Sequence, residues 1–227
     1  MTDLEKNIKY VFKCEDIKET ALSHSSFVNE KKLSPVESNE RLEFLGDAVL
    51  ELVMTDYLYS KYPDFLEGEL TKFRASVVCE PMLAKVAKRL SLGEFLKMGK
   101  GEEQTGGGER DSTLSDLFEA VIGAIYLDGG FESAKAFILR ELEPEAEHMQ
   151  TRFNQSDAKT FLQEKLQKNG AVNIEYKVAS EKGPEHEKHF SVTVSLNGKV
   201  LGEGEGRSKK EAEQNAAANA LSDMNFE

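Results

Sequence analysis

Several absences narrow the range of proteins that this sequence can encode. Only two cysteines occur among its 227 residues, Cys14 and Cys79, and they lack the spacing of metal ligands, which argues against a disulfide scaffold, a zinc site and redox chemistry. The longest apolar run, Ala120 to Leu127, is far shorter than the roughly 18 residues of a membrane helix, and the first residues contain no apolar signal core. We therefore expect a cytoplasmic protein without membrane contact.

Three further motifs are missing. The sequence contains no Gly-x-Ser-x-Gly element, no P-loop and no dinucleotide-binding fingerprint. Catalysis by a serine or cysteine nucleophile is therefore not expected, and neither is an organic cofactor.

Charge is distributed unevenly along the chain. The formal net charge of −12 at pH 7 would by itself argue against a polyanionic partner such as a nucleic acid. However, residues 157–227 contain 10 basic and 12 acidic side chains, so residues 1–156 carry a net charge of −10 and hold nearly all of the excess acidity. The C-terminal part therefore remains a candidate for binding nucleic acid.

Hydrophobic periodicity divides the chain into two parts. Residues 1–150 are predicted to form an all-α domain, with helical patterns at 37–61, 69–90, 112–127 and 131–148 and a flexible, glycine-rich loop at 99–108. Residues 151–156 are polar and lack periodicity, which indicates a linker. Residues 157–227 contain a helix at 157–169, two alternating strands, a short stretch around Val200 and an alanine-rich helix at 208–222, which predicts an α+β domain of order α-β-β-β-α.

Three carboxylates share one face of the first long helical pattern. Glu40, Glu43 and Asp47 lie within about 60° of one another on a helix. Taken alone, they fit a solvated polar face opposite an apolar stripe. That stripe would consist of Leu42, Leu45, Val49 and Leu52.

A second pair of carboxylates makes the solvated face less plausible. Asp116 and Glu119 are neighbours on a helix that is apolar nearly all round and is expected to be buried. Buried carboxylates must be protonated, paired with a cation or bridged by one. Oxygen ligands without His or Cys indicate Mg²⁺ or Mn²⁺. The alternative is pairing with a basic side chain, for which Arg41, Arg74 and Arg110 are available.

Four segments resemble the ribonuclease III endonucleases. The two long ones are Asn39-Glu-Arg-Leu-Glu-Phe-Leu-Gly-Asp47 and Leu114-Ser-Asp-Leu-Phe-Glu-Ala-Val-Ile-Gly-Ala-Ile-Tyr-Leu-Asp128, and the shorter ones are Ala21-Leu-Ser-His-Ser-Ser26 and Glu67-Gly-Glu-Leu-Thr-Lys-Phe-Arg-Ala75. The resemblance implies metal ligands at Glu43, Asp47, Asp116 and Glu119, with Asp47 and Glu119 catalytic and with Glu40 and Glu67 as accessory acids.

Three other residues are interpreted in the light of this resemblance. His24 is expected to be a packed or hydrogen-bonded structural residue, and not a general base, because it would lie beside an acidic metal site. Two positions depart from the family pattern. Ser115 stands where the family usually has Ala, and Gly108 stands where many members have Arg, so a phosphate contact from that loop is not carried over.

The C-terminal part resembles a double-stranded RNA-binding domain. Three segments show this resemblance, namely Asp157-Ala-Lys-Thr-Phe-Leu-Gln-Glu164, Gly183-Pro-Glu-His186 and Gly204-Glu-Gly-Arg-Ser-Lys-Lys-Glu-Ala-Glu213. The start of the last helix offers free N–H groups and added positive charge for a phosphate, whereas the other two segments can reach the minor groove of A-form RNA. The predicted RNA contacts are Thr160, Gln163, Glu164, His186, Ser208, Lys209 and Lys210.

Some features of the C-terminal part also have a purely structural interpretation. Lys209 and Lys210, taken alone, are typical of a solvated helix start. A run of small residues in the last helix is expected to pack on the sheet and not to contact a ligand. These residues are Ala212, Ala216, Ala217 and Ala220.

Together, these patterns predict a Mg²⁺-dependent endonuclease that cleaves double-stranded RNA. The resemblance implies 5′-phosphate and 3′-hydroxyl ends, two-nucleotide 3′ overhangs, a homodimer, and a role in processing precursors of rRNA and of some mRNA and tRNA. The apolar helix 117–127 is predicted to suit the subunit interface. Two alternatives stay open: a regulator that binds double-stranded RNA without cutting it, and a metal-dependent phosphohydrolase of small molecules with an attached targeting module.

Overall fold

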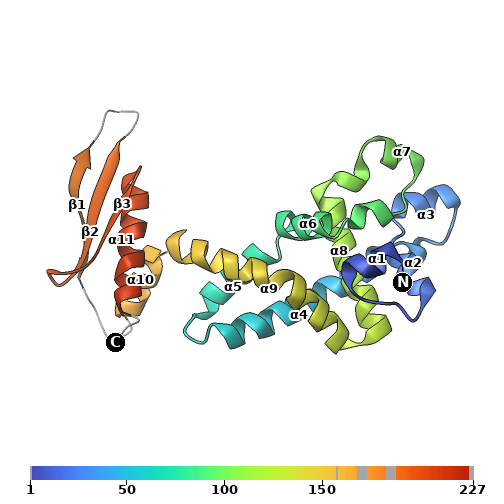
Figure 1. Cartoon of the computed structure of the whole chain (residues 1–227), viewed down its shortest axis with the longest axis horizontal. Coiled ribbons are helices and arrows are strands. Elements are labelled where there is room, and N and C mark those ends of the chain that lie inside the picture. Colours follow the sequence, from blue (N-terminus) through green and yellow to red (C-terminus); the bar gives the residue numbers. More distant parts are fainter. Residues whose placement is uncertain (1, 157, 168–172, 183–187, 225–227) are drawn as a thin grey trace. The chain divides into compact units, whose positions relative to one another are not determined.

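The structure is a computed structural model that describes residues 2–156, 158–167, 173–182 and 188–224. The chain forms two compact units, residues 1–147 and 148–227, and each is considered by itself (Figure 1). This division lies close to the predicted linker at 151–156. The structure continues a long helix through that linker as far as Ser156, so these residues are helical.

The described residues of the first unit form helices and short 3₁₀ turns, as predicted. In chain order they are α1 (Asp3–Ile8), α2 (Glu15–Ala21), α3 (Ser25–Lys31), η1 (Pro35–Glu37), α4 (Glu40–Lys61), α5 (Glu67–Val77), α6 (Glu80–Arg89), η2 (Leu92–Phe95), α7 (Lys100–Gln104), η3 (Gly107–Glu109), α8 (Asp111–Gly129) and α9 (Phe131–Ser156), of which α9 extends into the second unit.

Helix α8 forms the centre of the first unit. Leu117, Phe118 and Ile122 are fully buried, and α2, α4 and α6 pack around the helix. The apolar side chains of α8 from Leu117 to Ile125 are buried, which confirms that this part of the helix belongs to the core. The prediction that 117–127 suits a subunit interface is therefore wrong for residues 117–125, which are covered within one chain, whereas Leu127 is exposed. No helix in the described ranges is both long enough and apolar enough to cross a membrane.

Two segments differ from the sequence prediction. The pattern at 69–90 is two helices, α5 and α6, which are separated at Val78 and Cys79 because Pro81, in the first turn of α6, lacks the N–H that would continue a single helix. The predicted loop at 99–108 contains α7 and η3. Helix α3 holds this segment, since Ser26 Oγ accepts a hydrogen bond from Gly99 N at 3.0 Å and Glu30 Oε2 accepts one from Lys100 N at 2.7 Å.

The second unit has the predicted α-β-β-β-α order. Its elements are α10 (Ala158–Gln167), β1 (Ile174–Lys182), β2 (His189–Leu196), β3 (Lys199–Gly206) and α11 (Lys209–Met224). The strands form an antiparallel sheet of order β1-β2-β3. Asn197 and Gly198 both have positive φ at the β2–β3 turn, which is the conformation that an Asn-Gly hairpin favours.

The core of the second unit lies between the sheet and its two helices. Leu162 of α10 and Val192 and Val194 of β2 are fully buried there. The four alanines of α11 lie in the same core, which confirms that they pack on the sheet. They are Ala212, Ala216, Ala217 and Ala220.

Candidate metal centre and RNA-binding surface

The two acidic helices, α4 and α8, cross at a pair of glycines. A Cβ atom on Gly46 would lie 1.8 Å from the carbonyl oxygen of Glu119, and one on Gly123 would lie 2.2 Å from that of Leu42. Any larger residue at either position would therefore overlap the backbone of the other helix. This close crossing brings the carboxylates of α4 and α8 to one place.

Three carboxylates meet at the crossing. Glu43 of α4 and Asp116 and Glu119 of α8 each offer an oxygen atom, and these atoms lie within 4.8 Å of one another. We call these three residues the carboxylate cluster. Asp47 and Glu40 are close enough for their charges to raise the pKa of Glu43, and Asp47 also raises that of Glu119. The structure thus gathers the four predicted ligands and one predicted accessory acid.

The carboxylate cluster is poorly compensated. Burial, and then the charges of Asp47, Glu43 and Asp116, raises the pKa of Glu119 to about 8. Burial is also the main reason why the pKa of Glu43 and that of Asp116 are raised. Repulsion of this kind would be relieved by a bound cation.

The arginines that sequence analysis offered as alternative partners are not paired with the carboxylate cluster in the part of the chain that the structure describes. Arg74 pairs with Glu51 (Nε to Oε2, 2.7 Å), and Arg110 pairs with Glu102 (Nη1 to Oε1, 2.5 Å). Arg41 is exposed. Within the described ranges, none of these three forms an ion pair with the carboxylate cluster.

Three other predicted residues are not members of the carboxylate cluster, although His24 is close enough to Asp116 for its charge to offset part of the rise in the pKa of Asp116. Glu67 is exposed in the first turn of α5, where its Oε1 accepts a hydrogen bond from Thr71 Oγ1 at 3.1 Å, and it is not part of the carboxylate cluster. His24 precedes α3, and its Nδ1 accepts a hydrogen bond from Ser26 N at 3.2 Å, which confirms that it is hydrogen-bonded. Ser115 is buried within α8.

Sequence reasoning missed two acids near the cluster. Glu51 raises the pKa of Glu119, and Glu80 raises that of Asp116. Glu51 follows Asp47 by four residues, so helical spacing could have included it. Glu80 begins α6, and its proximity depends on how α6 packs on α8, which local sequence does not show.

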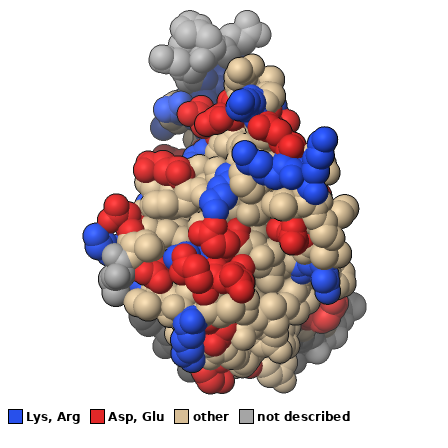
Figure 2. Space-filling view, turned by 90° about the vertical axis from the view of Figure 1, so that its right-hand side faces the viewer, with Lys and Arg blue, Asp and Glu red and all other residues tan. Residues whose placement is uncertain are grey.

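The donor set suits a hard divalent cation. The carboxylate cluster offers oxygen atoms only, and Mg²⁺ and Mn²⁺ prefer carboxylate oxygens and water. Figure 2 views the molecule from the side of α2, α3 and α7 and shows Asp and Glu side chains gathered near the centre of this face. The carboxylate cluster fits Mg²⁺ or Mn²⁺ by the chemistry of its oxygen ligands.

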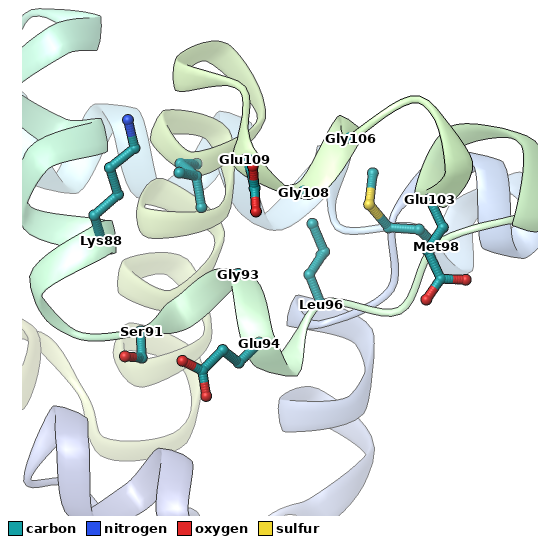
Figure 3. A pocket seen from close by; sticks show the side chains of 11 residues that line it. Lys88, Ser91, Gly93, Glu94, Leu96, Met98, Glu103, Gly106, Gly108 and Glu109 are labelled. Atoms are coloured by element: carbon teal, nitrogen blue, oxygen red, sulfur yellow. The ribbon is translucent and has the colours of Figure 1, made fainter.

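A separate hollow of about 690 Å³ lies on another side of α8 (Figure 3). It is lined by residues of η2, η3 and the start of α8, among them Gly93, Gly108 and Leu114, but by no member of the carboxylate cluster. Leu114 and Asp116 are two residues apart, so their side chains leave the helix about 160° apart, on nearly opposite sides. Gly108, the position that departs from the family pattern, therefore lines this hollow and not the carboxylate cluster.

Those predicted RNA contacts that the structure describes lie on α10 and at the start of α11. Ser208 Oγ accepts a hydrogen bond from Glu211 N at 3.2 Å and so caps α11. Lys209 and Lys210 are exposed at its first turn, and the Nζ of Lys209 lies 5.8 Å from the centre of the Phe190 ring.

Thr160 and Gln163 are exposed on α10 and lie one turn apart. Glu164 belongs to the same helix, but its side chain is outside the described part of the chain. His186 and its segment, 183–186, are also outside the described residues.

Comparison with known proteins identifies both units. A helical unit with a cluster of acids, followed by an α-β-β-β-α unit, is the architecture of a nuclease joined to an RNA-binding domain. Residues 15–145 match the family model "Ribonuclease-III-like", and residues 158–224 match the "Double-stranded RNA binding motif". The chain belongs to the ribonuclease III family and is an endoribonuclease.

Relatives share most of the chain. It is 50% identical to a Ribonuclease 3 from Bacillus licheniformis over 225 residues, which covers 97% of this chain and 88% of the relative, and 50% identical to one from Bacillus cereus over 218 residues, with 96% and 88% covered. The nuclease domain of a Campylobacter jejuni ribonuclease III has 48% identity and a TM-score of 0.58, covering 63% of this chain and 95% of that structure.

Proposed function

We propose that this enzyme cleaves double-stranded RNA with Mg²⁺, for which Mn²⁺ can substitute, and that it leaves 5′-phosphate and 3′-hydroxyl ends with two-nucleotide 3′ overhangs. Its substrates would be precursors of rRNA and of some mRNA and tRNA in the cytoplasm, and it would need no organic cofactor. The observation that carries this proposal is the convergence of poorly compensated carboxylates from α4 and α8.

Four carboxylates would hold the cation. They are Glu43, Asp47, Asp116 and Glu119, of which Asp47 and Glu119 are proposed as catalytic. A bound Mg²⁺ supplies charge that stabilises the phosphoryl oxygens and lowers the pKa of a coordinated water.

The side chains themselves prepare the site. Burial and the neighbouring carboxylates raise the pKa of Glu119 to about 8, so this side chain would gain most from a bound cation, whereas Asp47 is exposed and accessible to substrate. The close crossing at Gly46 and Gly123 fixes the spacing between the two acidic helices. Positioning by a rigid crossing of this kind limits the reorganisation that the reaction requires.

The second unit would supply most of the affinity for RNA. We assign residues 1–150 to the nuclease domain, 151–156 to the linker and 157–227 to the RNA-binding domain. The exposed first turn of α11, with Lys209 and Lys210, presents positive charge and N–H groups for phosphates. Thr160 and Gln163 on α10 can hydrogen-bond in the minor groove.

A homodimer is supported by an exposed apolar stripe on α4. Phe44, Leu52 and Tyr59 are 79%, 58% and 72% exposed, and helical spacing places them on one side of α4. Leu52 was expected on the inner stripe with Leu42, but only Leu42 is buried and Leu52 is exposed. Large exposed apolar side chains in a row are typical of a protein interface. For the Campylobacter jejuni nuclease domain, a region involved in dimer formation has been described. Each subunit would cut one strand.

The proposal can be tested on a labelled long RNA duplex. Incubation with Mg²⁺ or Mn²⁺ should give short duplexes with 5′-phosphate ends, whereas a chelator should abolish cleavage. A single-stranded RNA of the same sequence is the control substrate and should stay intact. Binding of the duplex without cleavage at any Mg²⁺ concentration would favour the non-cleaving regulator.

A further inference from the structure

A fixed guanidinium lies at one end of the row of acids on α4. Arg74 of α5 forms an ion pair with Glu51 (Nε to Oε2, 2.7 Å), and its Nη1 donates a hydrogen bond to Thr55 Oγ1 at 2.7 Å. Both partners belong to α4, so two bonds to another helix hold the orientation of the side chain. An arginine fixed in this way loses little conformational freedom when it binds a further group.

Helical spacing places Arg74 beside the proposed cleavage site. Glu43, Asp47, Glu51 and Thr55 follow one another at intervals of four residues, so Glu51 lies about 6 Å beyond Asp47 along the axis of α4. The proximity of Glu51 to the site is independently seen in its effect on the pKa of Glu119. Arg74 therefore lies about one helical turn from the residues proposed to hold the cation.

Arg74 also shares a face of α5 with a predicted accessory acid. Glu67 and Arg74 are seven residues apart, which is close to two helical turns. The hydrogen bond between Thr71 and Glu67 lies on the same side of the helix. One face of α5 and one side of α4 thus meet at Arg74.

The guanidinium retains capacity for another ligand. Nε and Nη1 have partners on α4, whereas Nη2 has no hydrogen-bond partner within the described ranges, and the side chain is 33% exposed. An arginine with a free edge is suited to a phosphate oxygen. Resting on the proposed function, we propose that Arg74 binds, through Nη2, a backbone phosphate of the RNA strand that is being cut, next to the phosphate that is cleaved.

The test uses the full-length enzyme with Mg²⁺ and a duplex RNA substrate. A contact made equally in the bound substrate and in the transition state affects KM and leaves kcat unchanged. We expect Arg74→Gln to raise KM about tenfold, the effect of one charged hydrogen bond, with kcat within about twofold of wild type. The slope of log(kcat/KM) against log[salt] should become less steep by about one unit, since one phosphate contact is lost.

Lys135→Gln is the matched control. Lys135 is also 33% exposed, and its ion pair with Asp56 (2.6 Å) also joins two helices of the first unit. Its substitution should leave KM and the salt slope unchanged. Arg74→Lys should retain the salt slope but still raise KM, because the ammonium lacks the planar fork. Melting temperature and sedimentation of each variant separate these effects from loss of fold or of assembly.

The double variant Glu51→Gln/Arg74→Gln separates RNA binding from a purely structural role. If Arg74 serves only to neutralise Glu51, removal of both charges should restore KM and the salt slope. Our proposal requires the double variant to keep the defect of Arg74→Gln. Restoration, or a salt slope for Arg74→Gln equal to that of Lys135→Gln, would overturn it. If the wild-type enzyme leaves duplex RNA uncut, the proposed function is overturned together with the role of Arg74. If the wild type cuts but Arg74→Gln behaves like Lys135→Gln, only the role of Arg74 is overturned.

Discussion

Substitution of Gly46 by alanine tests whether the crossing of α4 and α8 assembles the catalytic site. The new Cβ would lie 1.8 Å from the carbonyl oxygen of Glu119 and 3.0 Å from the backbone nitrogen of Gly123. Backbone atoms cannot rotate away, so the helices must move apart by more than about 1 Å. Overpacking of this size costs about 3 kcal/mol, which corresponds to a fall in melting temperature of about 6 to 12 °C.

The same displacement should reduce catalysis more than it reduces RNA binding. It separates Glu43 and Asp47 on α4 from Glu119 on α8, and a shift of about 1 Å in a catalytic group lowers the rate about 100-fold. We expect kcat for duplex RNA to fall by about this factor at saturating Mg²⁺ and at a temperature where the variant is folded. Duplex binding should stay close to wild type, because it depends mainly on the second unit.

A helical glycine with free space supplies the control. A Cβ on Gly101, in α7, would meet nothing within 4 Å. Gly101→Ala should therefore leave kcat unchanged and either leave stability unchanged or raise it by up to about 1 kcal/mol. If Gly46→Ala retains wild-type kcat, or if Gly101→Ala loses as much activity, the crossing is not what positions the carboxylates.

Four further predictions concern the charged groups, the domains and the dimer. Glu119→Gln should abolish cleavage but preserve duplex binding, and purified variant that cuts within about threefold of wild type would contradict the ligand assignment. Because the pKa of Glu119 in the folded chain, about 8, lies above its ordinary value of 4.5, the wild-type chain without divalent cations should lose stability as pH rises from about 5 to 8. Melting curves should show this loss, and Glu119→Gln should reduce it, leaving the part that comes from the raised pKa of Glu43 and of Asp116. A chain that ends near Arg152 should still cut at low salt but lose activity steeply as salt rises, since it lacks Lys209 and Lys210; salt tolerance equal to that of the full chain would refute this. A dimer of one wild-type and one Asp47→Asn subunit should nick only one strand of the duplex. The two subunits would carry different tags so that the heterodimer can be purified, and its products would be compared on native and denaturing gels. Double-strand breaks would show that the two sites are not independent.

Local sequence was sufficient for the secondary structure and the chemistry of the ligands. Periodicity of 3.6 and of two residues separated the helical part from the α-β-β-β-α part, and both were confirmed. Spacing placed Glu40, Glu43 and Asp47 on one face. The apolar surroundings of Asp116 and Glu119 in sequence already indicated burial, since a helix that is apolar all round has no solvated side.

Other features depended on contacts between distant segments. The sequence could not show that α8 would be covered by its own chain, and so helix 117–127 was taken for an interface, whereas Phe44 and Leu52 of α4 remain exposed. The segment at 99–108 was expected to be a flexible loop, but hydrogen bonds to Ser26 and Glu30, about 70 residues away, order α7.

To predict the carboxylate cluster, both the sequence and the tertiary structure are needed. Glycines at 46 and 123 are visible in the sequence, but a glycine in a helix has no local reason for being there and by itself costs helix stability. Only the tertiary structure shows that each lies against the backbone of the other helix. The sequence determines which atoms are available to bind a cation, because ligand chemistry belongs to single side chains. Their distances from one another are decided by the packing of α4 on α8, because a separation between two helices is a property of neither helix alone.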